Sequence, residues 1–200
     1  MSEPTTEEQL IALTIGGPPT QLNGPVFLAD YDPAWPLQFA GEEARIRDAL
    51  GDLVVEIHHV GSTSVPGLAA KPIIDICLVL PDTTDEAAYV PPLEAAGYVL
   101  RAREPDWFEH RLFKGHDPSV NLHVYPAGCG EIERYLLFRD RLRTHPEERE
   151  AYLAAKRDLA ARTWKYVQNY ADAKTEIVEA IIARAREEAD APQPVVGSAG

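Results

Sequence analysis

A glycine-serine turn, a lysine and an aspartate come close together in the stretch VEIHHVGSTSVPGLAAKPIIDI. Glycine lets a ligand approach the backbone, hydroxyl groups donate to phosphate oxygens, and the exposed amides of such a turn form a concavity for anions. The candidate site begins at His58, since one of two adjacent histidines must face the side of the turn. We predict a phosphate-binding site formed by Gly61, Ser62, Thr63, Ser64 and Lys71.

Asp75 is the single carboxylate in PIIDICLVLP, an apolar run that is typical of a buried strand. A buried aspartate is costly unless it is paired or binds a cation. Because the connection between the turn and this strand is short, we predict that Asp75 faces the same hollow as the turn. A Gly-Ser pair alone is common, and a plain turn without a ligand is its alternative interpretation.

Four basic residues of the C-terminal half are candidates for the opposite wall of this hollow. Arg139 and Arg143 lie one turn apart on the apolar side of their expected helix, where two like charges favour an anionic partner. Lys156 and Lys174 each lie on an apolar stripe of a later helix, from which a lysine can also snorkel to water. We predict that these four side chains bind phosphate.

The hydrophobic pattern predicts the elements that position these residues. A helix over residues 33–50 ends at Gly51, and a helix over 82–96 must bend or restart at Pro91-Pro92. WFEHRLFKG and VNLHVYP flank turn residues and predict an antiparallel hairpin. The other expected elements are strands over 26–32, 52–61, 72–81 and 98–102 and helices over 131–144, 146–167 and 170–190.

Composition favours one compact domain over residues 25–190, between flexible tails at 1–24 and 191–200. Of the 200 residues, 45% are hydrophobic, which suffices for a real core. Cys77 and Cys129 form no CxxC pair, so we expect both to be packing residues rather than zinc ligands or a disulfide. The three tryptophans are expected in or near the core, and Trp107 in a loop is the one that could serve as a stacking platform.

Charge limits the partners that we expect. The formal net charge of −13 repels a nucleic-acid backbone, so any nucleotide partner should be a small molecule bound in a local basic pocket. No run of roughly 18 apolar residues and no secretion signal occur, which predicts a cytoplasmic protein without membrane contact. The sequence carries no information on the oligomeric state.

Several segments together resemble the GrpB family, a branch of the nucleotidyltransferase-like proteins. HHVGSTSVPGLAAKPIIDI is similar to the family's signature, and the similarity spans residues 26–185. The resemblance implies an α+β fold, a nucleotidyltransferase-like mixed β-sheet with flanking helices and a C-terminal helical bundle. The other matching segments are DYDPAW, NLHVYPAG, LLFRDRLRTHPEEREAYLAAKRDLA and YADAKTEIVEAI.

The resemblance also implies a metal-dependent site. In the wider superfamily, a Gly-Ser turn is followed by two carboxylates on the next strand and a third on a later strand, which hold two magnesium ions. Asp75 matches the first carboxylate, but Cys77 stands at the second. At the third, the hairpin strand offers Asn121, His123 and Tyr125 on one face. Magnesium held by Asp75 and His123, both as catalytic residues, is therefore the expectation; a half-buried histidine bonded to a neighbour is the alternative for His123.

Two functions remain open from the sequence. The first is an enzyme that binds a nucleoside triphosphate and transfers a nucleotidyl group to a small acceptor, or adenylates it. The second is a non-catalytic module that binds a nucleotide or a phosphorylated metabolite, which the missing carboxylates favour. A protein-interaction role of the acidic surface is a weaker third.

Overall fold

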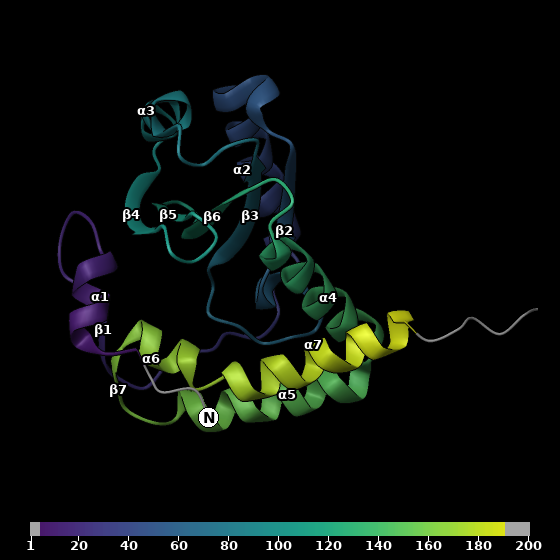
Figure 1. Cartoon of the computed structure of the whole chain (residues 1–200). Coiled ribbons are helices and arrows are strands. Elements are labelled where there is room, and N and C mark those ends of the chain that lie inside the picture. Colours follow the sequence, from purple (N-terminus) through teal and green to yellow (C-terminus); the bar gives the residue numbers. More distant parts are fainter. Residues whose placement is uncertain (1–4, 191–200) are drawn as a thin grey trace, which may run out of the picture.

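A mixed five-stranded β-sheet with helices on both faces forms the body of the computed structural model, which describes residues 5–190 (Figure 1). The central pair, β3 and β6, is parallel, and all other pairs are antiparallel. The predicted fold class is confirmed, because the mixed sheet, its flanking helices and the C-terminal helices are all present. In spatial order, the strands are β2 (Glu56–Val60), β3 (Ile74–Leu80), β6 (Val120–Pro126), β5 (His110–Gly115) and β4 (Val99–Glu104).

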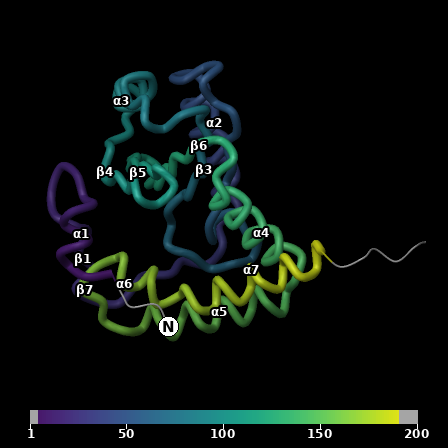
Figure 2. The backbone as a smooth tube through the Cα atoms, in the orientation of Figure 1, coloured from purple at the N-terminus to yellow at the C-terminus, as the bar shows by residue number. Residues whose placement is uncertain are grey.

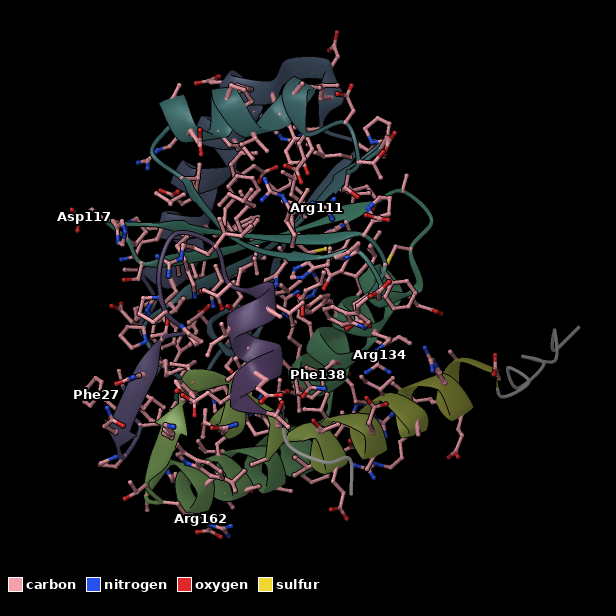
Figure 3. The ribbon with its side chains drawn as sticks, turned by 60° about the vertical axis from the view of Figure 1, so that its left-hand side comes forward. Phe27, Arg111, Asp117, Arg134, Phe138 and Arg162 are labelled. Atoms are coloured by element: carbon pink, nitrogen blue, oxygen red, sulfur yellow. The ribbon has the colours of Figure 1, made fainter. Side chains whose placement is uncertain are left out.

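One face of the sheet is apolar and packs against α2 (Trp35–Leu50) and α3 (Glu86–Ala95). Side chains alternate between faces along a strand, so every second residue of β3 and β6 joins this core. Figure 3 shows Arg111 on this side, where its guanidinium bonds Glu86 of α3. The buried strand residues of this core include Ile74, Ile76, Leu78, Leu80, Leu122 and Val124.

The other face is covered by helices of the C-terminal half. Helix α4 (Gly130–Thr144) packs Ile132 against Cys77, Val79 and Tyr125. Below it, α5 (Pro146–Ala160) and α7 (Thr175–Asp190) run side by side along the base of the molecule (Figure 2). None of the helices in residues 5–190 combines the length and the apolar content that a membrane span requires.

Local signals set most helix ends. Helix α2 has Pro36 in its first turn and ends at Gly51, whose φ of 54° suits glycine. Helix α3 begins at Glu86 rather than at residue 82, because the Asp82 carboxylate accepts a hydrogen bond from the Thr84 amide at 2.7 Å and holds a turn there. Both of its prolines lie inside one continuous helix.

The N-terminal segment differs from the predicted tail. Residues Glu7–Leu13 form α1, which Thr6 and Gln9 cap reciprocally, and β1 (Gln21–Gly24) pairs with β7 (Trp164–Tyr166). The predicted flexible tail is therefore wrong for much of 5–24, because a capping box and a distant strand partner order it. Residues 1–4 and the predicted tail at 191–200 lie outside the described residues.

The same strand pairing corrects the predicted helices near the C-terminus. The helix expected over 146–167 ends at Ala160, since the next residues extend to form β7 against β1. A short α6 (Val167–Asp172) follows, and α7 begins only at Thr175. The single helix expected over 170–190 is thus divided. Neither change could be seen locally, because the partner strand is about 140 residues away in the chain.

Candidate functional site

The Gly61 turn and the Asp75 carboxylate are in direct contact. Val60, the last residue of β2, pairs in register with Asp75, and Gly61 turns away with φ 67°. A Cβ atom at position 61 would lie 2.3 Å from Asp75 Oδ2, which no side chain could tolerate. Glycine is therefore required twice, for its backbone angle and for the space. The carboxylate and the turn share one side, as the sequence predicts.

Asn121 of β6 connects Asp75 to a lysine of the neighbouring strand. Its Nδ2 donates to Asp75 Oδ1 at 2.6 Å, and its Oδ1 accepts from Lys114 Nζ. An ammonium group can only donate, so Lys114 fixes which way the amide is turned. Burial raises the pKa of Asp75, and the hydrogen bond from Asn121 and the nearby lysines oppose that rise.

The charges of Lys71, Lys114 and Lys174 act on this carboxylate, and the carboxylate acts on a fourth lysine, Lys156. We call these four side chains the lysine cluster. The Nζ atoms of Lys174 and Lys71 lie 4.5 and 5.6 Å from the ring centroid of Tyr170. Lys156 is only 3% exposed and donates to the carbonyl of Ala69 at 2.6 Å. The structure thus brings the predicted Lys71, Lys156 and Lys174 together near Asp75, and adds Lys114.

Burial weakens the hold of these lysines on their protons. It lowers the pKa of Lys156 to about 7, with Lys174 adding to the effect. For Lys174 it lowers the pKa to about 8, with Lys71 adding to it. Asp75 opposes the fall in both cases, but one carboxylate cannot neutralise four ammonium groups.

The hydroxyl groups of the turn are used mainly inside the turn. Thr63 Oγ1 donates to the carbonyl of Ile73 at 3.1 Å, and Ser64 Oγ donates to the carbonyl of Gly61 at 2.6 Å. Both side chains are buried. Thr63 and Ser64 therefore stabilise the turn and do not present free hydroxyls, which corrects their expected place as phosphate ligands. Ser62 is half-buried, and its side chain lies beside the Tyr152 hydroxyl, whose pKa it lowers against the larger effect of burial.

The two arginines brace the turn from α4 instead of lining the hollow. Arg143 donates twice to the carbonyl of Ser64, at 3.0 and 2.8 Å, and Arg139 donates to the carbonyl of His59 at 3.3 Å. Asp140 of the same helix contacts both arginines, at 2.7 Å from Arg139 and 3.4 Å from Arg143. The predicted phosphate ligands thus bind backbone carbonyls, which attract guanidinium groups as anions do.

His123 belongs to a chain of hydrogen bonds rather than to a pair with Asp75. Its Nδ1 lies 3.1 Å from Nε2 of His110, whose Nδ1 lies 2.5 Å from the Glu104 carboxylate. A carboxylate only accepts, so His110 donates to Glu104 through Nδ1, and the neutral form of His110 then accepts from His123 through Nε2. This result corrects the predicted metal role and matches the alternative of a strand histidine bonded to a neighbour. His58 is likewise engaged, 2.7 Å from Glu56.

Two cavities border the lysine cluster. One, of about 560 Å³, is lined by Lys114 and Asn121 on the sheet and by Leu10 and Leu13 of α1. The other, of about 640 Å³, is lined by Lys174 together with Trp107 and Tyr135. Each is within the size range of small-molecule sites. The N-terminal segment, expected as a tail, therefore forms one wall.

Sequence reasoning missed Lys114, Glu104 and His110. The signal for Lys114 was present in the hairpin, because a four-residue turn between the strands sets Lys114 opposite Asn121. The side chains of Glu104 and His110 come from β4 and β5, which pair in register. The contact between Glu104 and His110 could have been predicted only once the pairing of β4 with β5 was known.

Sequence similarity to known proteins places the chain in a family. A family model described as GrpB protein matches residues 25–184. The UPF0157 protein BH1888 of Halalkalibacterium halodurans is 53% identical over 92% of this chain and 94% of that protein. The chain belongs to the GrpB family.

One solved structure shows the same fold. The crystal structure of GrpB from Enterococcus faecalis superposes with a TM-score of 0.70 and 28% identity, over 82% of this chain and 99% of that chain. A weaker likeness links the chain to the Cid1 poly(U) polymerase bound to MgATP, with a TM-score of 0.43 and 14% identity over 65% of this chain and 45% of that one.

Proposed function

We propose that this chain binds the phosphate groups of a nucleotide, or of another phosphorylated small molecule, between the Gly61 turn and the lysine cluster. The observation that carries the proposal is the excess of four lysine side chains over the one carboxylate, Asp75, with which they interact in a largely buried site. Buried charges are costly unless they are paired, so such an excess calls for an anion. The excess stands out in a protein with a net charge of −13.

The surroundings suit a nucleotide better than phosphate alone. Trp107 is 40% exposed and lines the same cavity as Lys174. It packs edge-on against Tyr125, with ring centroids 5.9 Å apart, which leaves it held in place beside the cavity. An aromatic face next to a cationic cluster can stack a base while the phosphates meet the lysines.

Nucleotidyl transfer is a second candidate, favoured by the contact of Asp75 with the glycine of the turn. That contact has the form that the superfamily pattern implies, a carboxylate beside a Gly-Ser turn. A transfer reaction predicts release of pyrophosphate from a nucleoside triphosphate, and its loss in Asp75→Asn. Binding alone predicts that Asp75→Asn keeps or strengthens affinity, because the change removes a negative charge.

Calorimetry with ATP and with pyrophosphate tests the proposal. Lys174→Met should weaken binding at least about tenfold, since a charge-assisted contact to phosphate contributes roughly 1.5–3 kcal/mol. Lys165→Met is the matched control, because Lys165 is exposed and paired with Glu7 on the outside of the molecule. Wild-type protein that binds neither ligand, or a Lys174→Met variant that binds as the wild type does, contradicts the proposal.

A further inference from the structure

The oxygen donors at this site do not suit a magnesium ion. Magnesium requires near-octahedral oxygen ligands, with one or two carboxylates among them. Asp75 is the carboxylate that contacts the turn in the described part of the chain; its Oδ1 accepts from Asn121, and its Oδ2 fills the space beside Gly61. Within residues 5–190, no three His, Cys, Asp or Glu side chains are grouped so as to hold an ion.

Cys77, which stands at the second carboxylate position, adds no ligand. It is fully buried, pairs in register with His123, and lies in the apolar cluster with Ile132 of α4. Burial raises the pKa of its thiol to about 12, so the sulfur stays protonated and neutral. A protonated soft donor has little affinity for magnesium.

The lysine cluster provides the opposite of what a cation needs. Lys156 and Lys174 act on each other, and Lys71 acts on both, as like charges. Lys114 is further affected by Arg101. Tyr170, whose ring lies under Lys71 and Lys174, is 1% exposed, and its hydroxyl has no hydrogen-bond partner among the described residues. A dication would be repelled here, and an oxyanion would be attracted.

We propose that the site binds its phosphorylated ligand without a divalent metal, with the ammonium groups of the lysine cluster in the place of the ion. This inference rests on the proposed function and narrows its ligand. The ligand must carry at least two negative charges close together, as a diphosphate, a triphosphate or a phosphate monoester dianion does. A single carboxylate or a neutral nucleoside would leave most of the lysine charge uncompensated.

The lysines also give metal-free binding a proton signature. Near pH 8 the ammonium groups of Lys156 and Lys174 are partly deprotonated in the free protein, because burial lowers their pKa values. A bound polyanion raises those pKa values, so binding takes up protons. Asp75 opposes the fall in the pKa of both lysines, whereas Lys71 adds to it. The cavity beside Lys174 is also lined by the carboxylates of Glu131, Asp172 and Glu179 and by the guanidinium of Arg134. A divalent ion would displace protons instead.

Titration calorimetry of the full chain with pyrophosphate, in excess EDTA and in excess magnesium, tests this inference. We expect saturable binding in EDTA and weaker apparent binding in magnesium, which competes for the ligand. Repeating the EDTA titration at pH 8 with ATP, whose phosphates are already fully ionised at that pH and release no proton on binding, in buffers of different ionisation enthalpy should show uptake of up to about one proton per site. The uptake should disappear near pH 6, and Lys156→Met should reduce it at pH 8.

The outcomes separate this inference from the proposed function. Binding that requires magnesium, or that releases protons at pH 8, overturns metal-free binding but leaves the phosphate site standing. An absence of binding in both EDTA and magnesium overturns the phosphate site, and with it this inference. Equal binding by Lys165→Met and the wild type shows that the titration reports the cluster and not surface charge.

Discussion

The two faces of the five-stranded sheet are built from the same strands but differ in chemistry, because the face toward α4 carries a chain of polar side chains beside its apolar cluster. On the face toward α2 and α3, Leu78 and Leu122 lie in a continuous apolar core. On the face toward α4, the neighbours Asp75, Asn121 and Lys114 form a polar chain across three strands. The difference shows how a strand separates two tasks, since consecutive residues point to opposite sides. One face holds most of the apolar core, and the other also carries buried charged groups, whose desolvation is unfavourable.

Two consecutive residues of β6, Asn121 and Leu122, give the strongest test of whether the two faces have separate roles. Leu122→Ala should lower the free energy of unfolding by about 3 kcal/mol, because Leu122 is fully buried and a cavity remains. Asn121→Ala should lower the free energy of unfolding by only about 1 kcal/mol. It should weaken pyrophosphate binding severalfold, because Asp75 and Lys114 are then free to pair directly with each other. Urea denaturation and calorimetry measure both. If Leu122→Ala weakens binding as much as Asn121→Ala does, the faces are not separate.

The turn at the edge of the polar face is tested by two glycines with similar backbone angles. Gly61→Ala should lower stability by about 2 kcal/mol more than Gly51→Ala does. Both have positive φ, 67° and 54°, but only the Cβ at position 61 meets Asp75. Thermal unfolding of the two variants measures the difference. Equal losses would mean that the carboxylate moves away from the turn without cost.

Lys156→Met should change the free energy of unfolding in the opposite direction to the substitutions above. Removal of a buried charge should raise the free energy of unfolding near neutral pH by about 1–2 kcal/mol, while phosphate binding weakens. The pKa of Lys156 is about 7 in the folded chain and 10.5 in the unfolded chain, so between these pH values the folded chain binds fewer protons. The free energy of unfolding of the wild type should therefore rise as the pH rises from 7 to 9. Lys156→Met should flatten that rise. A variant that is less stable than the wild type at pH 7 would contradict this.

The smallest effect is expected at Glu104, which belongs to the hydrogen-bonded chain with His110 and His123. Glu104→Gln replaces the charge-assisted bond to His110 by a neutral one and should cost about 1 kcal/mol. Anion binding should remain or strengthen slightly, since a negative charge beside the cavity is lost. Denaturation and calorimetry check both parts. A loss of binding like that of Lys174→Met would place the histidine chain in the ligand site.

The sequence predicts the sheet well because its strands carry strong local patterns. The buried run of β3 and the hairpin of β5 and β6 are confirmed, and so is α2 with Gly51 at its end. The contact between Gly61 and the Asp75 strand followed from a short connection. These features depend on neighbours in sequence or on one turn, which single-sequence patterns can read.

The rest depends on distant partners. Arg143 has the residue type of a phosphate ligand, and only the three-dimensional structure shows that Ser64 supplies its oxygen. Thr63 and Ser64 are hydroxyl donors by type, but their acceptors are carbonyls within the loop. Strand β7 forms because β1 is available, and neither has a strong pattern of its own. Lys114 joined the site through register with Asn121 rather than through a motif.

The pairing of β1 with β7 also decides where the chain can be cut. The family match starts at residue 25, after β1 and α1 have been passed. A protein trimmed to that boundary would keep its lysines and its glycine turn, but it would open the cavity beside Lys114 to water on the side of Leu10 and Leu13. Residues 5–24 thus form one rim of this cavity, and their removal should change the shape of what can enter while Lys114 and Asn121 stay at its floor.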